Sequence, residues 1–379
     1  MKNPEGKLST VVKIMLIFWL AFLNLEGILL KKIDVLVVDD SAFMRVLLRN
    51  LLREDSRIGK IRFGHDGLDA VQKTMSFSPD VVILDIIMPR MDGITALKEI
   101  MEKNPTPVLL LSALAREEVD KALKGGLDGG AVDFLQKTSA TGKLRESIQP
   151  YLLRKVVAAA RANVKQLQSL IRVADVQKLP PREDIVPTTL PRKVIVFAAS
   201  TGGPKTLDLI FSQFPRKTPP ILVVQHMDEK FTTSFAERLD LKSSIKVHEA
   251  RNGQSLRPST GLVAPGSHFH MDLRSGSIPS VTLVSGPKVN YVRPAADITM
   301  SGAASIFGAG TLGIVLTGMG HDGLEGAKAI KDSGGMVIAE APESCVVDSM
   351  PLGVIEAELA DVIAPKERIA GSIRRLGWF

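Results

Sequence analysis

Short apolar runs alternate with amphipathic helical patterns along most of the chain. Five runs lie between residues 34 and 135, and the segments between them carry apolar residues every three or four positions. Such runs are typical of strands buried on both faces of a sheet, and their alternation with helices indicates a parallel sheet. We therefore expect an α/β protein that opens with a flavodoxin-like, five-stranded parallel domain over residues 31–150. The predicted strands are 34–38, 60–63, 81–84, 108–111 and 131–135.

Another apolar run, residues 194–198, begins a different pattern. A serine, a threonine and two glycines follow it, and apolar residues then recur at helical spacing as far as Phe214. The segment predicts a strand, a tight glycine turn and a helix, with Ser200 at the carboxyl end of the strand. Open parallel sheets bind ligands at this edge, and the first turn of a helix supplies free N–H groups for negative charge. Ser200 is therefore a candidate nucleophile.

The same glycine turn also fits a phosphate-binding loop, which is the commoner use of such turns. The sequence contains neither the full G-x-G-x-x-G fingerprint nor a Walker lysine pattern at this position. It also departs from the G-x-S-x-G elbow of α/β-hydrolases, since Ala198 and Gly202 flank the serine at those offsets. The choice between nucleophile and phosphate loop therefore depends on the rest of the chain.

Two further apolar runs end in residues that complete a hydrolytic set. Residues 221–224 lead into His226, and residues 312–316 lead into Asp322. If these runs share one parallel sheet with the strand before Ser200, a nucleophile, a base and a carboxylate that orients the base meet at one edge. We therefore predict a doubly wound second domain in which these three residues perform acyl transfer.

The remaining histidines of this region and the single cysteine offer alternatives. His321 lies beside the predicted carboxylate and is a second candidate for the base. His268 and His270 form an H-x-H pair, which is a weak candidate for a metal site because it has no evident carboxylate partner. His248, on a strand-like segment, is expected to be structural, and the apolar neighbours of Cys345 predict that it is buried.

Polar residues also follow the predicted strands of the first domain. Asp39 and Asp40 close the first strand, Asp85 closes the third, Ser112 closes the fourth, and Lys137 follows the fifth. In a parallel sheet these ends lie on one edge, so three carboxylates, a hydroxyl and an ammonium converge. Clustered carboxylates repel one another unless a cation such as Mg²⁺ joins them, and a metal beside a lysine suits phosphoryl transfer. Helix capping or a turn explains each acid alone, but the five together predict a phosphoryl-transfer site.

A segment of different composition joins the two patterns. It first continues as helix-forming sequence rich in Ala, Leu, Gln and Lys, and it then carries four prolines without an apolar period. We therefore expect a linker at 151–191 and a second domain at 192–379. Basic residues along the linker, among them Arg154 and Lys155, are expected to form a solvated face.

Composition limits the class of protein. The 379 residues, 45% hydrophobic and 23% charged, suffice for two globular domains. The net charge of +7 is scattered, which does not favour nucleic-acid binding, and one cysteine excludes an internal disulfide and favours a reducing cytoplasm. Residues 1–30 contain an apolar run at 14–23 that is short for a membrane span. We expect these thirty residues to be a gene-start artefact without stable membrane insertion, and a membrane anchor is the alternative.

Residues 31–150 resemble the receiver domain of response regulators over their whole length. The resemblance makes Asp85 the phosphoacceptor, and it makes Asp39 and Asp40, together with Asp85, the residues that hold Mg²⁺. The glycine-rich stretch at 125–130 is expected to be unusually loose. Positions that respond to the phosphoryl group correspond to Ser112, Phe134 and Lys137.

Residues 192–379 resemble, from end to end, the catalytic domain of the chemotaxis protein-glutamate methylesterases, the CheB family. The matching segments are AASTGGP, VVQHMDEKFTTSFAERL, GLVAPGSHFHM, VLTGMGHDG and SCVVDSMP. The resemblance implies that Ser200 is the nucleophile, His226 the base and Asp322 the orienting acid. Two positions that support the histidine and the oxyanion region correspond to Thr201 and Met319.

Together the two resemblances imply a phosphorylation-activated serine esterase of a chemotaxis two-component system. It would hydrolyse glutamate γ-methyl esters, and deamidate glutamines, on methyl-accepting chemoreceptors, with the chemotaxis histidine kinase CheA as phosphodonor. The resemblances imply Mg²⁺ in the receiver, no cofactor for the esterase, a cytoplasmic location, and an unphosphorylated receiver that packs over the catalytic edge. Two rival classes are a DNA-binding response regulator, which would need a helix-turn-helix output, and a catalytically silent adaptor, which would have lost catalytic residues.

Overall fold

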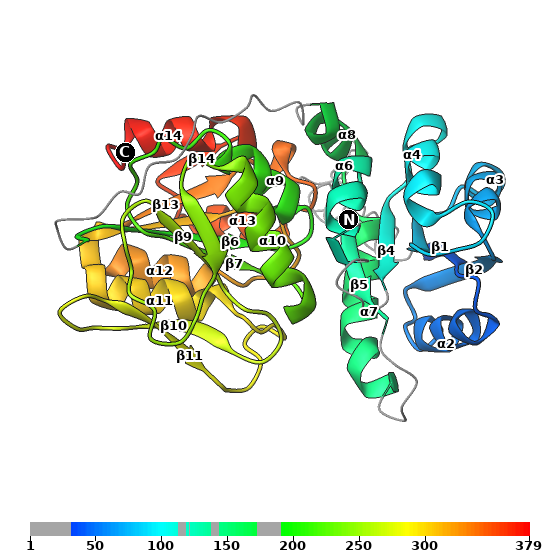
Figure 1. The fold of residues 1–379 in the computed structure, drawn as a ribbon, viewed down its shortest axis with the longest axis horizontal. Coiled ribbons are helices and arrows are strands. Elements are labelled where there is room, and N and C mark those ends of the chain that lie inside the picture. Colours follow the sequence, from blue (N-terminus) through cyan, green and yellow to red (C-terminus); the bar gives the residue numbers. More distant parts are fainter. Residues whose placement is uncertain (1–31, 113–118, 121, 138–143, 173–190) are drawn as a thin grey trace, which may run out of the picture.

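Two parallel sheets, each covered by helices, organise the protein in the computed structural model (Figure 1). The structure describes residues 32–112, 119–120, 122–137, 144–172 and 191–379. The predicted extension at 1–30 lies outside the described residues. Among the helices of these ranges, none has both the length and the hydrophobicity that a membrane span requires.

The first sheet has five parallel strands in the order β2-β1-β3-β4-β5. This order confirms the flavodoxin-like prediction, and each predicted strand matches an observed one to within two residues. The strands are β1 (Ile33–Val38), β2 (Ile58–Gly64), β3 (Val81–Asp85), β4 (Val108–Ser112) and β5 (Asp133–Gln136). The helices around them are α2 (Ala42–Leu52), α3 (Gly67–Phe77), α4 (Gly93–Lys103), η1 (Ala122–Gly126), α6 (Leu127–Gly129) and α7 (Leu144–Ala160).

The second sheet has seven parallel strands in the order β14-β13-β12-β6-β7-β9-β8. Its central strands are buried on both faces, which explains their unbroken apolar sequence and confirms the doubly wound prediction. The strands are β6 (Val194–Ala199), β7 (Ile221–Gln225), β8 (Lys246–Glu249), β9 (Thr260–Val263), β12 (Thr311–Val315), β13 (Met336–Glu340) and β14 (Val362–Ala364). The hairpin β10 (His270–Arg274) and β11 (Ser280–Val284) forms a separate antiparallel pair.

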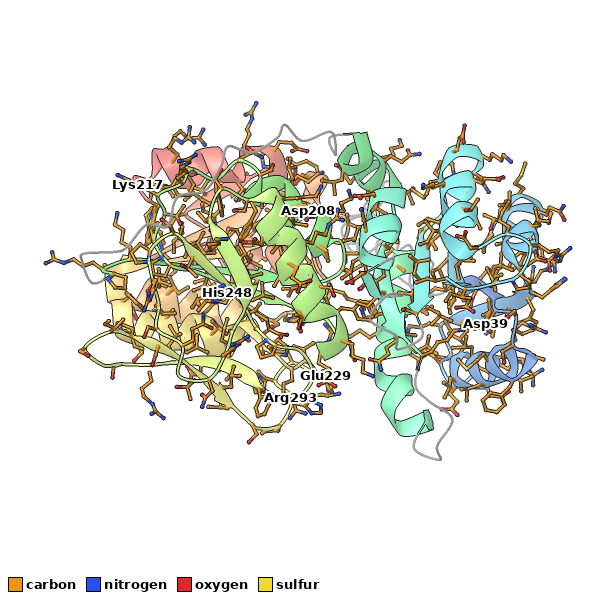
Figure 2. The ribbon with its side chains drawn as sticks, in the orientation of Figure 1. Asp39, Asp208, Lys217, Glu229, His248 and Arg293 are labelled. Carbon is orange, nitrogen blue, oxygen red and sulfur yellow. The ribbon has the colours of Figure 1, made fainter. Side chains whose placement is uncertain are left out.

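Longer helices and three short 3₁₀ turns surround the second sheet. The longer helices are α9 (Gly203–Phe211), α10 (Glu229–Lys242), α11 (Ala296–Phe307), α12 (Leu324–Asp332), α13 (Ser349–Glu356) and α14 (Ile369–Arg375). The short turns are η2 (Gly308–Gly310), η3 (Pro342–Ser344) and η4 (Lys366–Arg368). Figure 2 shows Asp208 and Glu229 on the side of this unit that faces the first sheet, whereas Lys217 lies on the far side.

Two helices of the predicted linker lie between the sheets (Figure 1). α7 packs against β5 of the first sheet, and α8 (Val164–Arg172) contacts the second unit. The backbone N–H of Asn163 donates to the carbonyl of Val346 at 2.8 Å, and Lys366 Nζ lies 2.6 Å from Gln166 Oε1. The chain between the sheets is therefore packed as far as Leu170, and the linker boundaries at 151 and 191 stay a prediction.

Candidate active site and acidic pocket

The carboxyl edge of the first sheet carries an acidic pocket. Asp39 and Asp40 follow β1, Asp85 ends β3, and their carboxylate oxygens lie within 4.8 Å of one another. Lys137, just after β5, places Nζ 2.7 Å from Asp39 Oδ2 and 2.6 Å from Asp85 Oδ2. Ser112 ends β4 and is buried. The carbonyl of Ser112 accepts from the backbone N–H of Lys137 at 2.7 Å, so the structure places the five predicted residues at one edge of the sheet.

Burial and repulsion decide the charge of this pocket. Burial raises the pKa of Asp85 to about 6, and the charge of Asp39 adds to the rise while Lys137 opposes it. Burial works against the charge of Lys137, but Asp85 and Asp39 outweigh it and raise the pKa of the ammonium. Asp40 is exposed, so ions from solvent can reach the three acids. Carboxylate oxygens are the ligands that Mg²⁺ prefers, and the cluster is consistent with a Mg²⁺ site.

The second sheet places the predicted catalytic residues after three adjacent strands. Ser200 follows β6, His226 follows β7, and Asp322 lies in the loop after β12. The strand order reverses between β6 and β12, and open parallel sheets bind ligands at such a reversal. The turn after Ser200 requires Gly202, which has a φ of +81°. A Cβ at this position would lie 2.5 Å from the Cβ of Val346.

His226 and Asp322 form a buried pair. Nε2 of His226 lies 2.6 Å from Oδ2 of Asp322. On the other side of the ring, Nη2 of Arg154 lies 3.4 Å from Nδ1. Because an arginine only donates, Nδ1 accepts this bond, and the neutral ring carries its proton on Nε2. Asp322 therefore fixes the tautomer, and Nδ1 is the nitrogen that can take up a proton.

The carboxylate of Asp322 sits at the N-terminus of α11. It accepts hydrogen bonds from the first two backbone N–H groups of that helix, at 2.6 and 3.1 Å. Burial works against its ionisation, but the hydrogen bond and charge of His226 and these N–H groups lower the pKa of Asp322. Asp297 stabilises the loop that carries Asp322, because it accepts hydrogen bonds from the backbone N–H groups of Gly323 and Gly326, each at 2.8 Å. Burial, followed by the charge of Asp322, raises the pKa of Asp297.

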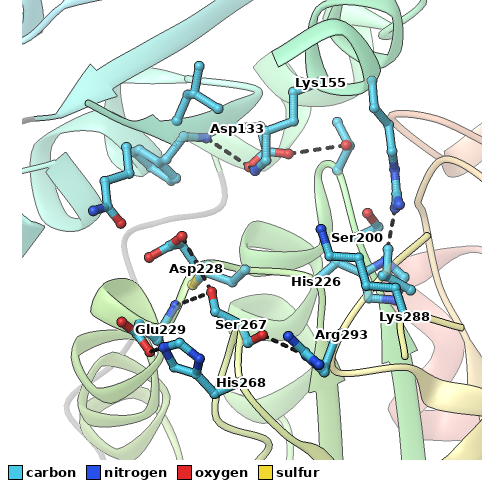
Figure 3. A pocket seen from close by; sticks show the side chains of 17 residues that line it. Asp133, Lys155, Ser200, His226, Asp228, Glu229, Ser267, His268, Lys288 and Arg293 are labelled. Carbon is cyan, nitrogen blue, oxygen red and sulfur yellow. Dashed lines mark hydrogen bonds and ion pairs between the residues drawn. The ribbon is translucent and has the colours of Figure 1, made fainter. Parts of the chain in front are cut away.

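Ser200 lines a cavity of about 360 Å³ between the two units (Figure 3). Its hydroxyl makes no hydrogen bond to His226 or to any other residue in the described ranges. Its backbone N–H donates to the Thr317 carbonyl at 3.0 Å and is therefore occupied. The backbone N–H groups of Thr201 and Met319 find no acceptor in the described part of the chain. These two groups are the candidate donors for an oxyanion beside Ser200.

Residues from the first unit and from α7 close one side of this cavity (Figure 3). Asp133 accepts a hydrogen bond from the Thr201 hydroxyl at 3.1 Å and pairs with Lys155 at 2.6 Å. Arg154 also donates to the backbone carbonyl of Met319 at 3.4 Å. The predicted solvated face is therefore wrong for Arg154 and Lys155, because α7 packs on β5 and places both side chains at the site. The supporting roles predicted for Thr201 and Met319 stay predictions.

The glycine-rich stretch of the first unit also takes part in this contact. The sequence predicts a loose segment here, whereas the structure shows η1 and α6, with Leu127 and Gly129 buried. A Cβ on Gly126 would lie 2.5 Å from Leu110, so the absence of a side chain allows close packing. Phe134 is buried and stacks on Phe231 of α10, with ring centroids 5.7 Å apart.

The alternative residues occupy other environments. His270 is buried, and its ring accepts from the N–H of Ala295 at 3.1 Å. His268 pairs with Glu229 at 2.7 Å, and His321 is exposed. Among the described residues, the acidic pocket is the one cluster with metal-binding geometry, so the H-x-H pair does not form such a site there. His248 lies in β8, and Cys345 is buried as predicted.

A buried carboxylate supports the turn that contains Ser200, residues 200–203, which we call the nucleophile turn. Glu340 ends β13 and accepts hydrogen bonds from the backbone N–H of Thr317 at 2.8 Å and the hydroxyl of Ser344 at 3.0 Å. The carbonyl of Thr317 accepts from Ser200, and its hydroxyl lies 3.0 Å from the carbonyl of Thr201. Glu340 therefore positions the nucleophile turn through Thr317.

Replacing Glu340 with glutamine should stabilise the protein above pH 7. Burial raises the pKa of Glu340 to about 7 from the usual 4.5, and the hydrogen bonds only partly oppose it. The folded state therefore binds a proton that the unfolded state releases, and wild-type stability falls as the pH rises through that window. Glutamine keeps an acceptor for Thr317 without this cost.

The wild type and the glutamine variant should be equally stable near pH 4.5, the usual pKa of a glutamate. Above about pH 7, the pKa of Glu340 in the folded protein, the free energy of unfolding of the variant should exceed that of the wild type by up to about 3 kcal/mol. Chemical denaturation at both pH values measures the difference, with Glu356→Gln on the exposed end of α13 as control. A variant that is less stable than the wild type at high pH would contradict this assignment.

Comparison with known families matches both units. Residues 195–373 match the family model described as CheB methylesterase, and residues 35–149 match that of the response regulator receiver domain. The first match spans most of the second sheet and its helices, and the second match spans the first sheet.

Similar proteins extend over nearly the whole chain. A protein-glutamate methylesterase/protein-glutamine glutaminase of Pyrococcus horikoshii is 40% identical over 347 residues, which are 90% of this chain and 93% of the relative. The protein of the same description from Thermotoga maritima is 41% identical over 341 residues, covering 89% and 96%. The crystal structure of the Thermotoga maritima CheB methylesterase catalytic domain is 44% identical, with a TM-score of 0.48, over 48% of this chain and 98% of that one.

Proposed function

This chain belongs to the CheB methylesterase family, and from that premise we propose that Ser200, His226 and Asp322 carry out its reaction. The chain is a protein-glutamate methylesterase/protein-glutamine glutaminase with a receiver domain. The observation that carries the proposal is the 2.6 Å bond between His226 and Asp322 at the cavity that Ser200 lines. The acidic phosphoacceptor pocket consists of Asp39, Asp40 and Asp85.

The reaction begins at Ser200. Its hydroxyl oxygen attacks the γ-carbonyl carbon of a methylated glutamate, and Nδ1 of His226 takes the hydroxyl proton. Asp322 keeps the other ring proton on Nε2 and stabilises the imidazolium that forms. When the tetrahedral intermediate collapses, the carbon–methoxy bond breaks and the methoxy oxygen takes the proton from His226. Methanol leaves, and an acyl ester on Ser200 remains.

Water completes the cycle. Nδ1 of His226 takes a proton from a water molecule whose oxygen attacks the acyl carbon, and Ser200 regains its proton as the ester breaks. The product is a glutamate carboxylate. With a glutamine side chain, the same steps release ammonia in place of methanol. The N–H groups of Thr201 and Met319 bind the oxyanion in both halves of the reaction, because no described acceptor competes for them.

We further propose that Asp85 is the phosphorylated residue. Its carboxylate oxygen attacks the phosphorus of the donor's phosphoryl group, and the bond from that phosphorus to the donor breaks, so the donor leaves without its phosphoryl group. Lys137 and the hydroxyl of Ser112 bind the oxygens of the transferred group. Asp39, Asp40 and Asp85 would hold Mg²⁺, which supplies positive charge for those oxygens when bound. The esterase chemistry uses the chain's own residues alone.

The contacts between the two units support a closed, inactive arrangement. Arg154 hydrogen-bonds to Nδ1 of His226, the atom that has to take the Ser200 proton. Asp133 binds the hydroxyl of Thr201, next to the nucleophile. A substrate helix cannot reach Ser200 while these contacts persist. We propose that phosphate on Asp85 breaks them by shifting a two-state contact between the domains.

The family membership supports the choice of partners. We propose that methyl-accepting chemoreceptors are the substrates and that the chemotaxis histidine kinase CheA is the phosphodonor, in a cytoplasmic two-component system. The glutamate ester of the receptor is the reactive group, and no part of the proposed reaction involves nucleic acid.

Replacing Asp85 with asparagine should remove activation by phosphodonor. Asparagine has the same shape but cannot accept a phosphoryl group. Methanol release from methylated chemoreceptor fragments, with Mg²⁺ and with or without acetyl phosphate, measures the effect. We expect the wild type to rise roughly tenfold, which corresponds to a shift of about 1.4 kcal/mol in the domain contact, and the variant not to respond.

Asp332→Asn is the matched control, because Asp332 is exposed on the far end of α12. It should keep the full response to acetyl phosphate. An Asp85→Asn variant that acetyl phosphate still activates would exclude Asp85 as the phosphoacceptor. A wild type that releases no methanol under any of these conditions would exclude the esterase function.

A further inference from the structure

Two buried cations lie beside the nucleophile turn, on the face that meets the receiver. Lys205 lies in the first turn of α9, directly after the turn, and Arg238 lies on α10, which begins just after His226. Only 4% of Lys205 and 8% of Arg238 are exposed. The catalytic steps described above use neither side chain.

The carboxylate partners of these cations come from both domains. Arg238 donates through Nε and Nη2 to Oδ2 of Asp208, at 2.9 and 2.7 Å, and Nη2 also donates to Oδ1 of Asp128 at 2.7 Å. Nζ of Lys205 lies 2.8 Å from the same oxygen of Asp128. Asp128 belongs to α6 of the receiver. A single receiver carboxylate therefore bridges two cations of the methylesterase domain.

The positive charges of Lys205 and Arg238 have one carboxylate contact within the methylesterase domain, the bond from Arg238 to Asp208, and their shared partner Asp128 belongs to the receiver. Lys242 approaches Oδ2 of Asp208 at 3.9 Å, so Arg238 and Lys242 pair with that one carboxylate, whereas the ion-pair partner of Lys205 is Asp128 of the receiver. Within the described ranges, Oδ1 of Asp208 is buried without a hydrogen bond. Burial opposes the ionisation of Asp128, yet hydrogen bonds from Arg238 and Lys205 lower its pKa to about 2. The site therefore binds a carboxylate that another molecule or domain supplies.

We propose that Lys205 and Arg238 form a carboxylate-binding site that anchors an acidic residue of the substrate helix when the receiver has moved away. Asp128 fills this site in the closed arrangement and stands in for the substrate carboxylate. The inference rests on the proposed function, in which the receiver leaves the catalytic edge.

The chemistry of the reaction fits such an anchor. Each turnover leaves a glutamate carboxylate on the substrate, and residues three or four apart on a helix lie on the same face. A helix with several modifiable glutamates thus presents a carboxylate near a remaining ester. A charge-assisted pair with Lys205 and Arg238 would hold that carboxylate while Ser200 attacks the ester.

The variant Lys205→Gln tests the anchor in the full-length enzyme activated with Mg²⁺ and acetyl phosphate. Three substrates are compared: a methylated chemoreceptor fragment, the same fragment with its unmodified acidic residues changed to serine, and the γ-methyl ester of N-acetylglutamate α-amide, which carries no carboxylate. We expect KM for the acidic fragment to rise about tenfold while kcat stays within about twofold. KM for the other two substrates should not change. Lys217→Gln, an exposed lysine on the far side of the domain, should have no effect (Figure 2).

A measurement on the wild type keeps the test independent of the folding of any variant. High ionic strength should raise KM for the acidic fragment more than KM for the serine-substituted fragment, because salt screens a charge-assisted contact. Equal KM values for the acidic and serine-substituted fragments at low salt would overturn the proposal, as would a Lys205→Gln effect of the same size on all three substrates. If the wild type releases no methanol from any substrate, the proposed function itself fails, which is a separate outcome.

Discussion

Replacing Ser200 with alanine should abolish methanol release from methylated chemoreceptor fragments. The expected loss in kcat is about a thousandfold or more, because the variant cannot form the acyl-enzyme. Its fold should be preserved, since the Ser200 hydroxyl makes no hydrogen bond in the described part of the chain and the bond from its backbone N–H to Thr317 remains. Gas chromatography of released methanol, in enzyme activated with acetyl phosphate, measures the loss.

The matched control for this variant is Ser277→Ala, in the exposed turn of the β10–β11 hairpin. It should release methanol at the wild-type rate. A Ser200→Ala enzyme that kept more than about a tenth of the wild-type kcat would show that another group attacks the ester, since loss of a true nucleophile costs far more. A wild type that binds the fragments without releasing methanol would instead indicate an adaptor.

Replacing Arg154 with alanine should raise the methanol release of the enzyme that has received no phosphodonor. In the closed arrangement the guanidinium donates to Nδ1 of His226 and to the carbonyl of Met319. The first bond keeps Nδ1 from accepting the Ser200 proton, and both bonds hold α7 against the site. Loss of contacts worth about 1 to 1.5 kcal/mol should raise the open population, and with it the basal rate, by roughly tenfold. The fully phosphorylated rate should change little, because these contacts are already broken in the open form.

Arg161→Ala is the control, because Arg161 is an exposed arginine just after the end of α7. It should leave both rates unchanged. A basal rate of the Arg154 variant at or below the wild-type rate would contradict the role of Arg154 in closing the site. A fall in the phosphorylated rate would show that Arg154 assists the open enzyme, which the proposed function does not include.

The elements that position the site could be predicted from the sequence because their signals are local. Buried parallel strands such as β6 and β12 require unbroken apolar runs, and those runs stand out in the sequence. The candidate residues directly follow such strands, and the topology of a parallel sheet brings the ends of adjacent strands together. For this reason the sequence predicts that Ser200, His226 and Asp322 share one edge of the second sheet. The same reasoning predicts that the residues of the acidic pocket share one edge of the first sheet.

Groups that reach the site from distant parts of the chain could not be predicted in this way. Arg154 and Lys155 lie on a helix whose sequence resembles an ordinary solvated helix, and only its packing on β5 places them beside His226 and Asp133. Asp297 lies in the first turn of its helix, where an acidic residue is ordinary capping sequence. Its function becomes evident only when α11 and α12 are packed together.

The most direct test of the account is to identify the atom that the substrate acylates. Activated enzyme is mixed with a methylated chemoreceptor fragment, quenched in acid and digested with trypsin, which should release residues 194–205 as one peptide. The account predicts that this peptide gains the mass of the ester-bearing tryptic piece of the substrate less one methanol, that fragmentation places this mass on Ser200, and that acetyl phosphate increases the amount. Methanol release with the acyl group on a different residue, or with equal labelling with and without acetyl phosphate, would contradict it.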